Sequence, residues 1–471
     1  MRRLSAIATA VVACFLSGPA SAASFTHSDS MLPMSDGVDL AATLYEPSGA
    51  RPPAGWPAVI MFHGLGGTRA DTNAIAEGSF ASQGYAVLTT DFRGHGQSGG
   101  LSSIDGPREI TDVRALFDWL AARPEIDAKH IGAWGISLGG GAIWRSLVAS
   151  VPFAAVETVE TWTDLLQALT PQNLSKSGLV AGFLSLIPTS RTDPSVLAVR
   201  ADALSSANSE ALRAFGDIRS SRSALGRITT PALIFQGRRD FAFGLEQGVE
   251  LYQGLAGPKR LYIGDFGHVP STFPGPDFSV VMAEASDWFD RYLKGMPNGI
   301  DTRKPVELAP DPFQEAQNVS YSSLPPTKTL TLAARGSATI GGAGKVVRSL
   351  GKASTRLETF GSGIVRLPVT VRAGWKHLVA VLTATTPSGD TILVSDGGVP
   401  TNPGKQTVSI RLLSDATVIP RGSRLTLTVA GSSVAQNPAN LLYLATVADD
   451  ARITIGAGTL RLPVLQHPIS G

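Results

Sequence analysis

Three polar side chains follow separate apolar segments of the chain, and their types fit nucleophilic catalysis. Ser137 is the centre of the run Gly-Ile-Ser-Leu-Gly at residues 135–139, and Asp240 and His268 each end a short glycine-containing segment. A serine hydroxyl at its ordinary pKa is a weak nucleophile, so it needs a base, and the base needs an acid that orients it. We therefore predict Ser137 as nucleophile, His268 as base and Asp240 as acid.

The run around Ser137 has the neighbours that a nucleophile elbow requires. An apolar strand is predicted at Ile131–Trp134 and a helix at Gly140–Ala149. Such an elbow holds the serine in a strained turn, and its small flanking residues let the strand and the helix approach closely. In hydrolases with this elbow the acid and then the histidine follow the serine along the chain, which is the order found here.

Asp240 has two rivals for the role of acid. Glu160 and Asp164 come just after the predicted strand Phe153–Val159, a place that some hydrolases use instead. Asp240 and His268 each follow a predicted strand, so both are expected at the carboxyl ends of parallel strands, where open α/β sheets hold their sites. We favour Asp240 for this reason.

An oxyanion that forms during acyl transfer needs hydrogen-bond donors. The backbone amide of Leu138, directly after the nucleophile, is one expected donor. The second is expected from the glycine-rich loop at residues 62–67, with the amide of Leu65 as the favoured group. A plain turn between strand and helix is the alternative interpretation of this loop.

The elements that would position these residues alternate between strand and helix. Short, continuously apolar segments separated by helical ones are typical of a parallel sheet buried on both faces. Ser24–Leu32 and Asp39–Tyr45 are expected to form a hairpin at the edge of this sheet. The predicted central strands are Ala58–Phe62, Tyr85–Thr90, Ile131–Trp134, Phe153–Val159, Ala232–Phe235 and Arg260–Ile263.

The alternation of strands and helices also predicts the domain organisation. We expect an α/β catalytic domain at residues 23–295, a linker at 296–324 and an all-β sandwich at 325–471. The alternation of strands and helices is interrupted at about residues 161–227, which indicates a helical cap inserted into the α/β domain. Within this cap we interpret the apolar segment Gly178–Pro188 as a core helix, and a lipid-facing or substrate-lining surface is the alternative.

Residues 1–22 have the composition of a secretory signal peptide. Two arginines precede an apolar run shorter than the roughly 20 residues needed to span a bilayer, and Ala20-Ser21-Ala22 is a small-residue cleavage site. We therefore expect a secreted or periplasmic protein without a membrane span. A lipoprotein anchor on Cys14, the only cysteine, is the less favoured alternative.

The charge balance and the histidine pattern argue against several classes of partner. The chain has 40 basic and 38 acidic residues, and loss of the two leader arginines would make the numbers equal. This balance favours neither nucleic acid nor an anionic membrane surface as a partner. The seven histidines are scattered without paired ligand spacing, so neither a metal nor another cofactor is expected.

The chain resembles the α/β-hydrolases of the cocaine esterase and Xaa-Pro dipeptidyl-peptidase type, the CocE/NonD hydrolases. The resemblance rests on Asp91–Gly99, on Asp127–Gly141 and on Ile419–Leu427, which is similar to a strand of the dipeptidyl-peptidase C-terminal jelly roll. It implies an α/β-hydrolase core with a jelly-roll-like β-sandwich behind it. Family members typically carry a tyrosine near the first oxyanion strand, whereas residues 63–65 here are His-Gly-Leu, which favours a more general esterase.

Three functions are compatible with these features. The leading hypothesis is hydrolysis of a carboxylic ester, or less often an amide, through an acyl-enzyme on Ser137. The second is an Xaa-Pro dipeptidyl-peptidase, which would need a carboxylate such as Glu157 or Glu160 to hold the free amine of its peptide substrate. The third is a glycan- or surface-binding protein on a hydrolase scaffold, with Phe360, Trp375 and Tyr443 as its candidate aromatic residues.

Overall fold

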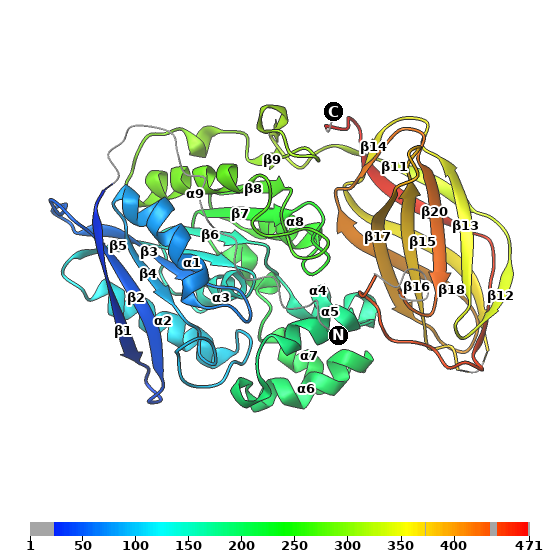
Figure 1. The fold of residues 1–471 in the computed structure, drawn as a ribbon, viewed down its shortest axis with the longest axis horizontal. Coiled ribbons are helices and arrows are strands. Elements are labelled where there is room, and N and C mark those ends of the chain that lie inside the picture. The colour runs from blue at the N-terminus through cyan, green and yellow to red at the C-terminus, as the bar shows by residue number, and fades with distance from the viewer. Residues whose placement is uncertain (1–22, 373, 434–439, 470–471) are drawn as a thin grey trace.

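The computed structural model describes residues 23–372, 374–433 and 440–469. The expected signal peptide at 1–22, with Cys14, lies outside the described residues. An α/β part, coloured blue to green, and an antiparallel β part, coloured yellow to red, lie side by side along the long axis of the molecule (Figure 1). Among the described residues, no helix combines the length and the apolar character needed to cross a membrane.

A ten-stranded sheet forms the centre of the α/β part, in the order β1-β2-β4-β3-β5-β6-β7-β8-β9-β10. Strands β4 to β9 of this order run parallel, and β1 (Phe25–Pro33) and β2 (Asp39–Pro47) form the expected antiparallel hairpin at one edge. The predicted central strands are confirmed as β3 (Trp56–Phe62), β4 (Ala86–Thr90), β5 (Ile126–Ile136), β6 (Val156–Val159), β7 (Ala232–Gly237) and β8 (Lys259–Gly264).

Helices cover both faces of this sheet and bury its central strands. In β3, Ile60 contributes to one hydrophobic cluster while Val59 and Met61 contribute to another, as the two-residue period of a strand requires. The first cluster contains side chains of α2 (Pro107–Ala121), α3 (Leu138–Val148) and α8 (Leu245–Gly254). The second contains side chains of α1 (Arg69–Ile75) and α9 (Phe278–Leu293).

The predicted linker at 296–324 is wrong in part, because it supplies two strands to the main sheet. Strand β9 (Val306–Leu308) pairs in parallel with β8, and β10 (Val319–Tyr321) pairs in antiparallel fashion with β9. Val306 and Leu308 are fully buried. Each strand has only three residues, which is too short for an alternation to stand out in a segment rich in proline and charge.

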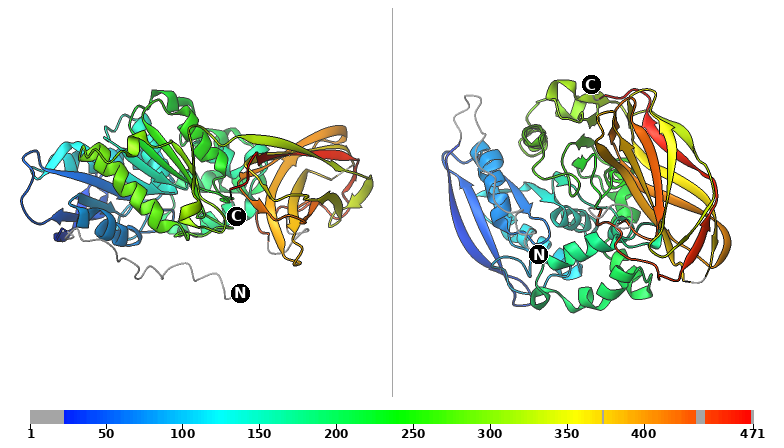
Figure 2. Two further views of the ribbon diagram at one scale, coloured as in Figure 1. Left: turned by 90° about the horizontal axis from the view of Figure 1, so that it is seen from above. Right: turned by 45° about the vertical axis from the view of Figure 1, so that its right-hand side comes forward.

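Four short helices form a cap within the predicted range of 161–227. They are α4 (Leu165–Leu169), α5 (Ser177–Ser185), α6 (Pro194–Ser205) and α7 (Glu210–Asp217), and they lie between the sheet and the β part (Figures 1 and 2). Helix α7 begins after Ser209, whose side chain caps it by accepting a hydrogen bond from the amide of Leu212.

The C-terminal part is all-β, as predicted, and its strands are antiparallel. One sheet pairs β11-β22-β15-β21-β12 with β18 beside β15, a second has the order β13-β20-β16-β17, and β14 pairs with β19. The strands are β11 (Thr327–Ala334), β12 (Ala338–Gly341), β13 (Lys345–Lys352), β14 (Leu357–Glu358), β15 (Gly361–Val371), β16 (His377–Thr385), β17 (Thr391–Pro400), β18 (Gly404–Asp415), β19 (Val418–Ile419), β20 (Arg424–Ala430), β21 (Arg452–Ile455) and β22 (Gly458–Leu465).

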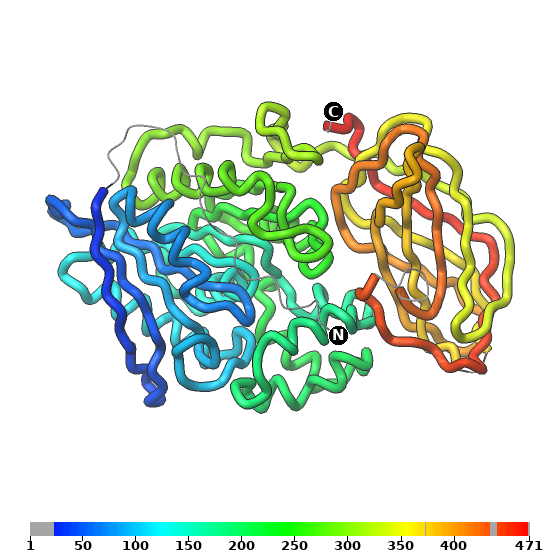
Figure 3. The backbone as a smooth tube through the Cα atoms, viewed as in Figure 1, coloured from blue at the N-terminus to red at the C-terminus, as the bar shows by residue number. Residues whose placement is uncertain are grey.

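The α/β part and the β part share a small hydrophobic cluster of their own. Leu174 from the cap and Phe241 from the loop after β7 pack with Val379 and Val381 of β16. The tube in Figure 3 shows the chain passing from the α/β part into the β part after β10, the last strand of the ten-stranded sheet. The loop after β7 is the loop that carries Asp240, so the two parts meet beside the predicted acid.

Candidate active site

The structure brings Ser137, His268 and Asp240 together at the carboxyl end of the parallel sheet. The imidazole Nε2 of His268 lies 3.1 Å from the Oγ of Ser137, and its Nδ1 lies 2.7 Å from an oxygen of Asp240. Ser137 follows β5, Asp240 follows β7 and His268 follows β8, as the sequence predicted. The three side chains therefore form one continuous hydrogen-bonded chain.

Ser137 occupies the strained turn that a nucleophile elbow requires. Its φ is 53° and its ψ is −113°, a combination that is costly for a residue with a side chain. The glycines beside it are needed for space, because a Cβ on Gly139 would lie 2.3 Å from the carbonyl oxygen of Phe62. The turn presents the Ser137 hydroxyl above the sheet, at the start of α3.

Asp240 is fully buried and is held by backbone amides. One carboxylate oxygen accepts hydrogen bonds from the amides of Ala242 and Phe243 at 2.8 and 2.9 Å, and the other accepts from the amide of His268 at 3.2 Å. Amide donors stabilise the ionised form of a carboxyl group. These bonds hold the carboxyl group of Asp240 where it can orient the imidazole.

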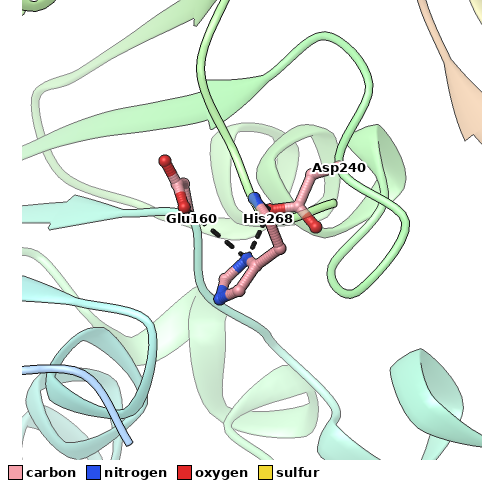
Figure 4. A group of neighbouring side chains, drawn as sticks. All are labelled: Glu160, Asp240 and His268. Atoms are coloured by element: carbon pink, nitrogen blue, oxygen red, sulfur yellow. Dashed lines mark hydrogen bonds and ion pairs between the residues drawn. The ribbon is translucent and has the colours of Figure 1, made fainter. Parts of the chain in front are cut away.

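Glu160, one of the two rival acids, also faces the imidazole (Figure 4). Its Oε2 lies 3.6 Å from Nδ1 of His268, and its other oxygen has no hydrogen-bond partner among the described residues. Burial raises the pKa of Glu160 to about 8, so it carries a proton at neutral pH. Asp164, the other rival, instead accepts a hydrogen bond from the amide of Gln167 and caps α4.

The neighbours of His268 favour its protonated form. Burial lowers the pKa of His268, but the negative charge of Asp240 and its hydrogen bond to Nδ1 outweigh burial. Glu160 adds a second negative charge once it ionises near pH 8, and together these groups raise the pKa of His268 to about 9. The rings of Phe243 and Phe183 meet the imidazole edge-on, with centroids 5.1 and 5.8 Å away, and they keep water from that side. A base that must be neutral to act will therefore gain activity as the pH rises towards 9.

The Glu160→Gln variant is expected to move the rising limb of the pH profile to lower pH. The substitution removes one source of negative charge beside the imidazole, so the pKa of His268 falls while Asp240 still orients it. The measurement is kcat/KM for an ester substrate between pH 5 and pH 10. An unchanged midpoint would mean that Glu160 has no electrostatic influence on the base.

Glu160, Asp240 and His268 also have the ligand types of a metal site. One ligand atom from each lies within 4.8 Å of the others. Both imidazole nitrogens of His268 are already engaged, Nδ1 with Asp240 and Nε2 with Ser137. We therefore assign the group to proton transfer.

The two predicted oxyanion donors lie on either side of Ser137. Leu138 begins α3 directly after the serine, and Leu65 lies in the loop after β3, where both residues line the same cavity as Ser137. Within the described ranges, the amides of Leu65 and Leu138 donate no hydrogen bond to another backbone group. This arrangement is compatible with two free amides beside the hydroxyl.

His63 supports the loop that carries Leu65, a role that sequence reasoning missed. Its ring lies fully buried, with Nδ1 2.7 Å from the carbonyl oxygen of Gly64 and Nε2 accepting from the amide of Phe92 at 3.0 Å. Burial lowers the pKa of His63 to about 4, so the ring stays neutral and can make both bonds. His95 packs beside it, with its Nδ1 3.1 Å from the carbonyl oxygen of Arg93.

An apolar cavity opens beside the Ser137 hydroxyl, under the cap. Val180, Phe183 and Leu184 of α5 form part of its wall, so the alternative of a lining surface applies to Gly178–Pro188, while the burial of Val180 and Ile187 fits the predicted core helix. The lining residues are Leu65, Ile104, Ser137, Leu138, Trp162, Leu165, Leu166, Leu169, Thr170, Val180, Phe183, Leu184, Val196, Val199, Arg200, Ala203, Leu212, Phe215, Gly216 and Phe243.

Two buried cations fasten the loop that carries Asp240. The ammonium group of Lys176, in the cap, donates to the carbonyl oxygens of Phe241 and Ala242 at 2.7 and 3.0 Å. Arg238 forms a buried ion pair with Glu358 of β14 and donates to the carbonyl oxygen of Ala416 at 2.9 Å. The cap and the β part therefore both hold this loop in place.

The comparisons with known proteins agree with this geometry. Residues 36–270 match the X-Pro dipeptidyl-peptidase (S15) family. The quorum-quenching protein AidA of Acinetobacter baumannii is 36% identical over 138 residues, which make up 28% of this chain and 42% of that protein. The chain thus spans less than half of the length of this curated relative.

Solved structures show the same fold along almost the whole chain. A CocE/NonD family hydrolase from Staphylococcus aureus matches with a TM-score of 0.74 at 15% identity and covers 94% of both chains. An α-amino acid ester hydrolase matches with a TM-score of 0.69 at 15% identity and covers 98% of this chain and 100% of its own. By its sequence match the chain belongs to the X-Pro dipeptidyl-peptidase (S15) family, and its fold is that of the CocE/NonD α/β-hydrolases.

Proposed function

We propose that this protein is a secreted serine hydrolase that cleaves carboxylic esters through an acyl-enzyme on Ser137. The observation that carries the proposal is the hydrogen-bonded chain from Ser137 through His268 to Asp240, at the mouth of an apolar cavity. Membership of a hydrolase family supports the reaction class. The leader-like composition of residues 1–22 supports secretion.

The reaction follows from the order of these contacts. His268 Nε2 takes the proton of Ser137 as its Oγ attacks the ester carbonyl carbon, while the amides of Leu65 and Leu138 stabilise the oxyanion. Collapse of the intermediate expels the alcohol, which takes the proton from Nε2. A water molecule then loses a proton to Nε2 and attacks the acyl-enzyme, which releases the acid and restores Ser137.

The cavity favours an ester substrate over a dipeptide with a free amine. Among the described residues that line it, none is an aspartate or a glutamate. Glu157, one candidate for holding the amine, is fully buried in β6, and Glu160 faces His268. Neither carboxyl group reaches the cavity wall, so an Xaa-Pro dipeptidyl-peptidase is the weaker proposal.

A glycan-binding role for the β part has little support. Phe360, Trp375 and Tyr443, the aromatic residues considered for it, are 7%, 2% and 1% exposed. Rings that are buried in this way have no free face on which a sugar could stack. Their burial instead supports a structural role, in which the β part packs against the α/β part.

The test compares p-nitrophenyl esters with the p-nitroanilides of Ala-Pro and Gly-Pro. We expect turnover of the esters and little turnover of the prolyl anilides, and a fluorophosphonate should label Ser137, as peptide mass spectrometry would show. Preferential cleavage of the anilides would establish the peptidase instead. Label on another residue, with activity lost, would contradict the role of Ser137.

Secretion has a separate test. The full chain is expressed in a bacterial host, and the N-terminal sequence of the protein in the periplasm or medium is determined. We expect it to begin at Ala23, directly after the small-residue site that ends at Ala22. A cytoplasmic protein that retains Met1 would contradict the proposal, and a lipidated Cys14 would establish the lipoprotein alternative.

A further inference from the structure

The cavity beside Ser137 is almost entirely apolar and has room for a substrate group. It encloses about 90 Å³, and of its lining residues only Ser137, Thr170 and Arg200 are polar. Leucine, valine, phenylalanine and tryptophan side chains supply most of the wall. Transfer of an apolar group from water into a cavity with such a wall is favourable.

The cavity begins at the atom that would carry the acyl group. Ser137 lines it together with the two expected oxyanion donors, Leu65 and Leu138. Phe183 and Phe243, whose rings pack against His268, line it as well. The leaving alcohol departs after the first step, whereas the acyl group stays bonded to Ser137 until water releases it. We therefore assign the cavity to the acyl group.

We infer that this enzyme selects uncharged, apolar acyl chains, which lie in the cavity between Ser137 and helix α6. The inference rests on the proposed function and adds the class of acyl group. An aminoacyl or dipeptidyl group would bring a cationic amine into an apolar wall that has no carboxylate among the described residues, and burying an unpaired charge is costly. An aliphatic acyl chain has no such cost.

The far end of the cavity is formed by one face of α6. Val196, Val199 and Ala203 line it, and they lie three, four and seven residues apart, as residues on one helical face do. Figure 1 places α6 at the outer edge of the cap, on the side away from the sheet. The side chains of Val199 and Ala203 should therefore limit the length of the acyl chain.

The first test is a series of p-nitrophenyl esters from acetate to tetradecanoate. Each methylene that enters the cavity should raise kcat/KM about fourfold, until the chain reaches α6 and the gain stops. A flat or falling series from acetate onward, in an enzyme that hydrolyses acetate esters through Ser137, would overturn the inference while leaving the proposed function intact. Loss of ester hydrolysis altogether would contradict the proposed function itself.

The second test changes the depth of the cavity. Ala203→Phe should lower kcat/KM for the longest good substrate at least tenfold relative to kcat/KM for the acetate ester, so the optimum moves to shorter chains. Ala203→Leu should give a smaller shift in the same direction, and Val199→Ala should move the optimum to longer chains. The Leu and Ala variants keep the test meaningful if the phenylalanine disturbs folding.

Ala201→Phe is the matched control. Ala201 is exposed on α6 and does not line the cavity, so the same substitution there should leave the chain-length profile unchanged. Thermal melting of each variant checks the fold. Equal losses for acetate and long-chain esters in Ala203→Phe, or an optimum that stays in place in all three cavity variants, would overturn the inference.

Discussion

Replacing Ser137 with alanine should lower kcat for p-nitrophenyl esters by on the order of a millionfold, as in other enzymes that use this arrangement. The variant keeps the cavity and the oxyanion amides, so a small residual rate above that of water should remain. Its folding should be unchanged, because a smaller side chain relieves rather than adds crowding at the strained turn. A stopped assay with purified variant protein and a fluorophosphonate-treated control measures the loss.

Asp240→Asn separates the two carboxyl groups that face the imidazole. An asparagine amide favours the wrong imidazole tautomer, so kcat should fall by about ten-thousandfold. Glu160→Gln should leave kcat at its optimal pH within about tenfold, because Glu160 acts through charge and makes no short hydrogen bond to His268. A greater loss for the Glu160 variant than for the Asp240 variant would assign the role of acid to Glu160.

The Arg238→Met variant should lower the free energy of unfolding by about 3–5 kcal/mol, because it breaks the buried ion pair that Arg238 makes with Glu358. The side chains of Arg238 and Glu358 are 1% and 0% exposed. Activity should fall as well, since Arg238 lies two residues before Asp240. Urea unfolding and ester hydrolysis measure the two effects on the same preparation.

Two further variants make this prediction specific to the buried pair. Asp301→Asn breaks an ion pair with Arg291 in which both side chains are partly exposed, and it should cost less than about 1 kcal/mol. Combining Arg238→Met with Glu358→Leu should recover part of the lost stability, because the buried charge of Glu358 is then removed as well. If the double variant is less stable than the sum of the single changes, the pair is not the source of the effect.

The sequence predicted those parts of the molecule that depend on residues close together in the chain. The run Gly-Ile-Ser-Leu-Gly between a strand and a helix fixes the turn at Ser137, since its glycines are the only residues that fit there. Helix α9 is likewise determined locally, because its apolar residues follow one helical face and Gly295 follows its end. Asp240 and His268 were found because each directly follows a buried strand.

The features that were missed depend on partners distant in the sequence. Glu358 pairs with an arginine 120 residues earlier, and no spacing along the chain reports such a contact. The approach of Glu160 to His268 likewise depends on β6 and β8 ending at the same edge of the sheet. The apolar residues of α5 satisfy a core pattern equally well, because a cavity wall and a core require the same side chains.

The attachment of the Asp240 loop to the β part has a consequence for the order of events during synthesis. Arg238 donates to the carbonyl oxygen of Ala416, which is translated 178 residues later. At roughly 5–20 residues per second, that interval lasts about 10–35 seconds. The nascent chain can thus form its sheet and its nucleophile elbow while the acid still lacks its support. We therefore expect the chain to become able to hydrolyse its substrate late, when the last third of the chain has folded against the first two thirds.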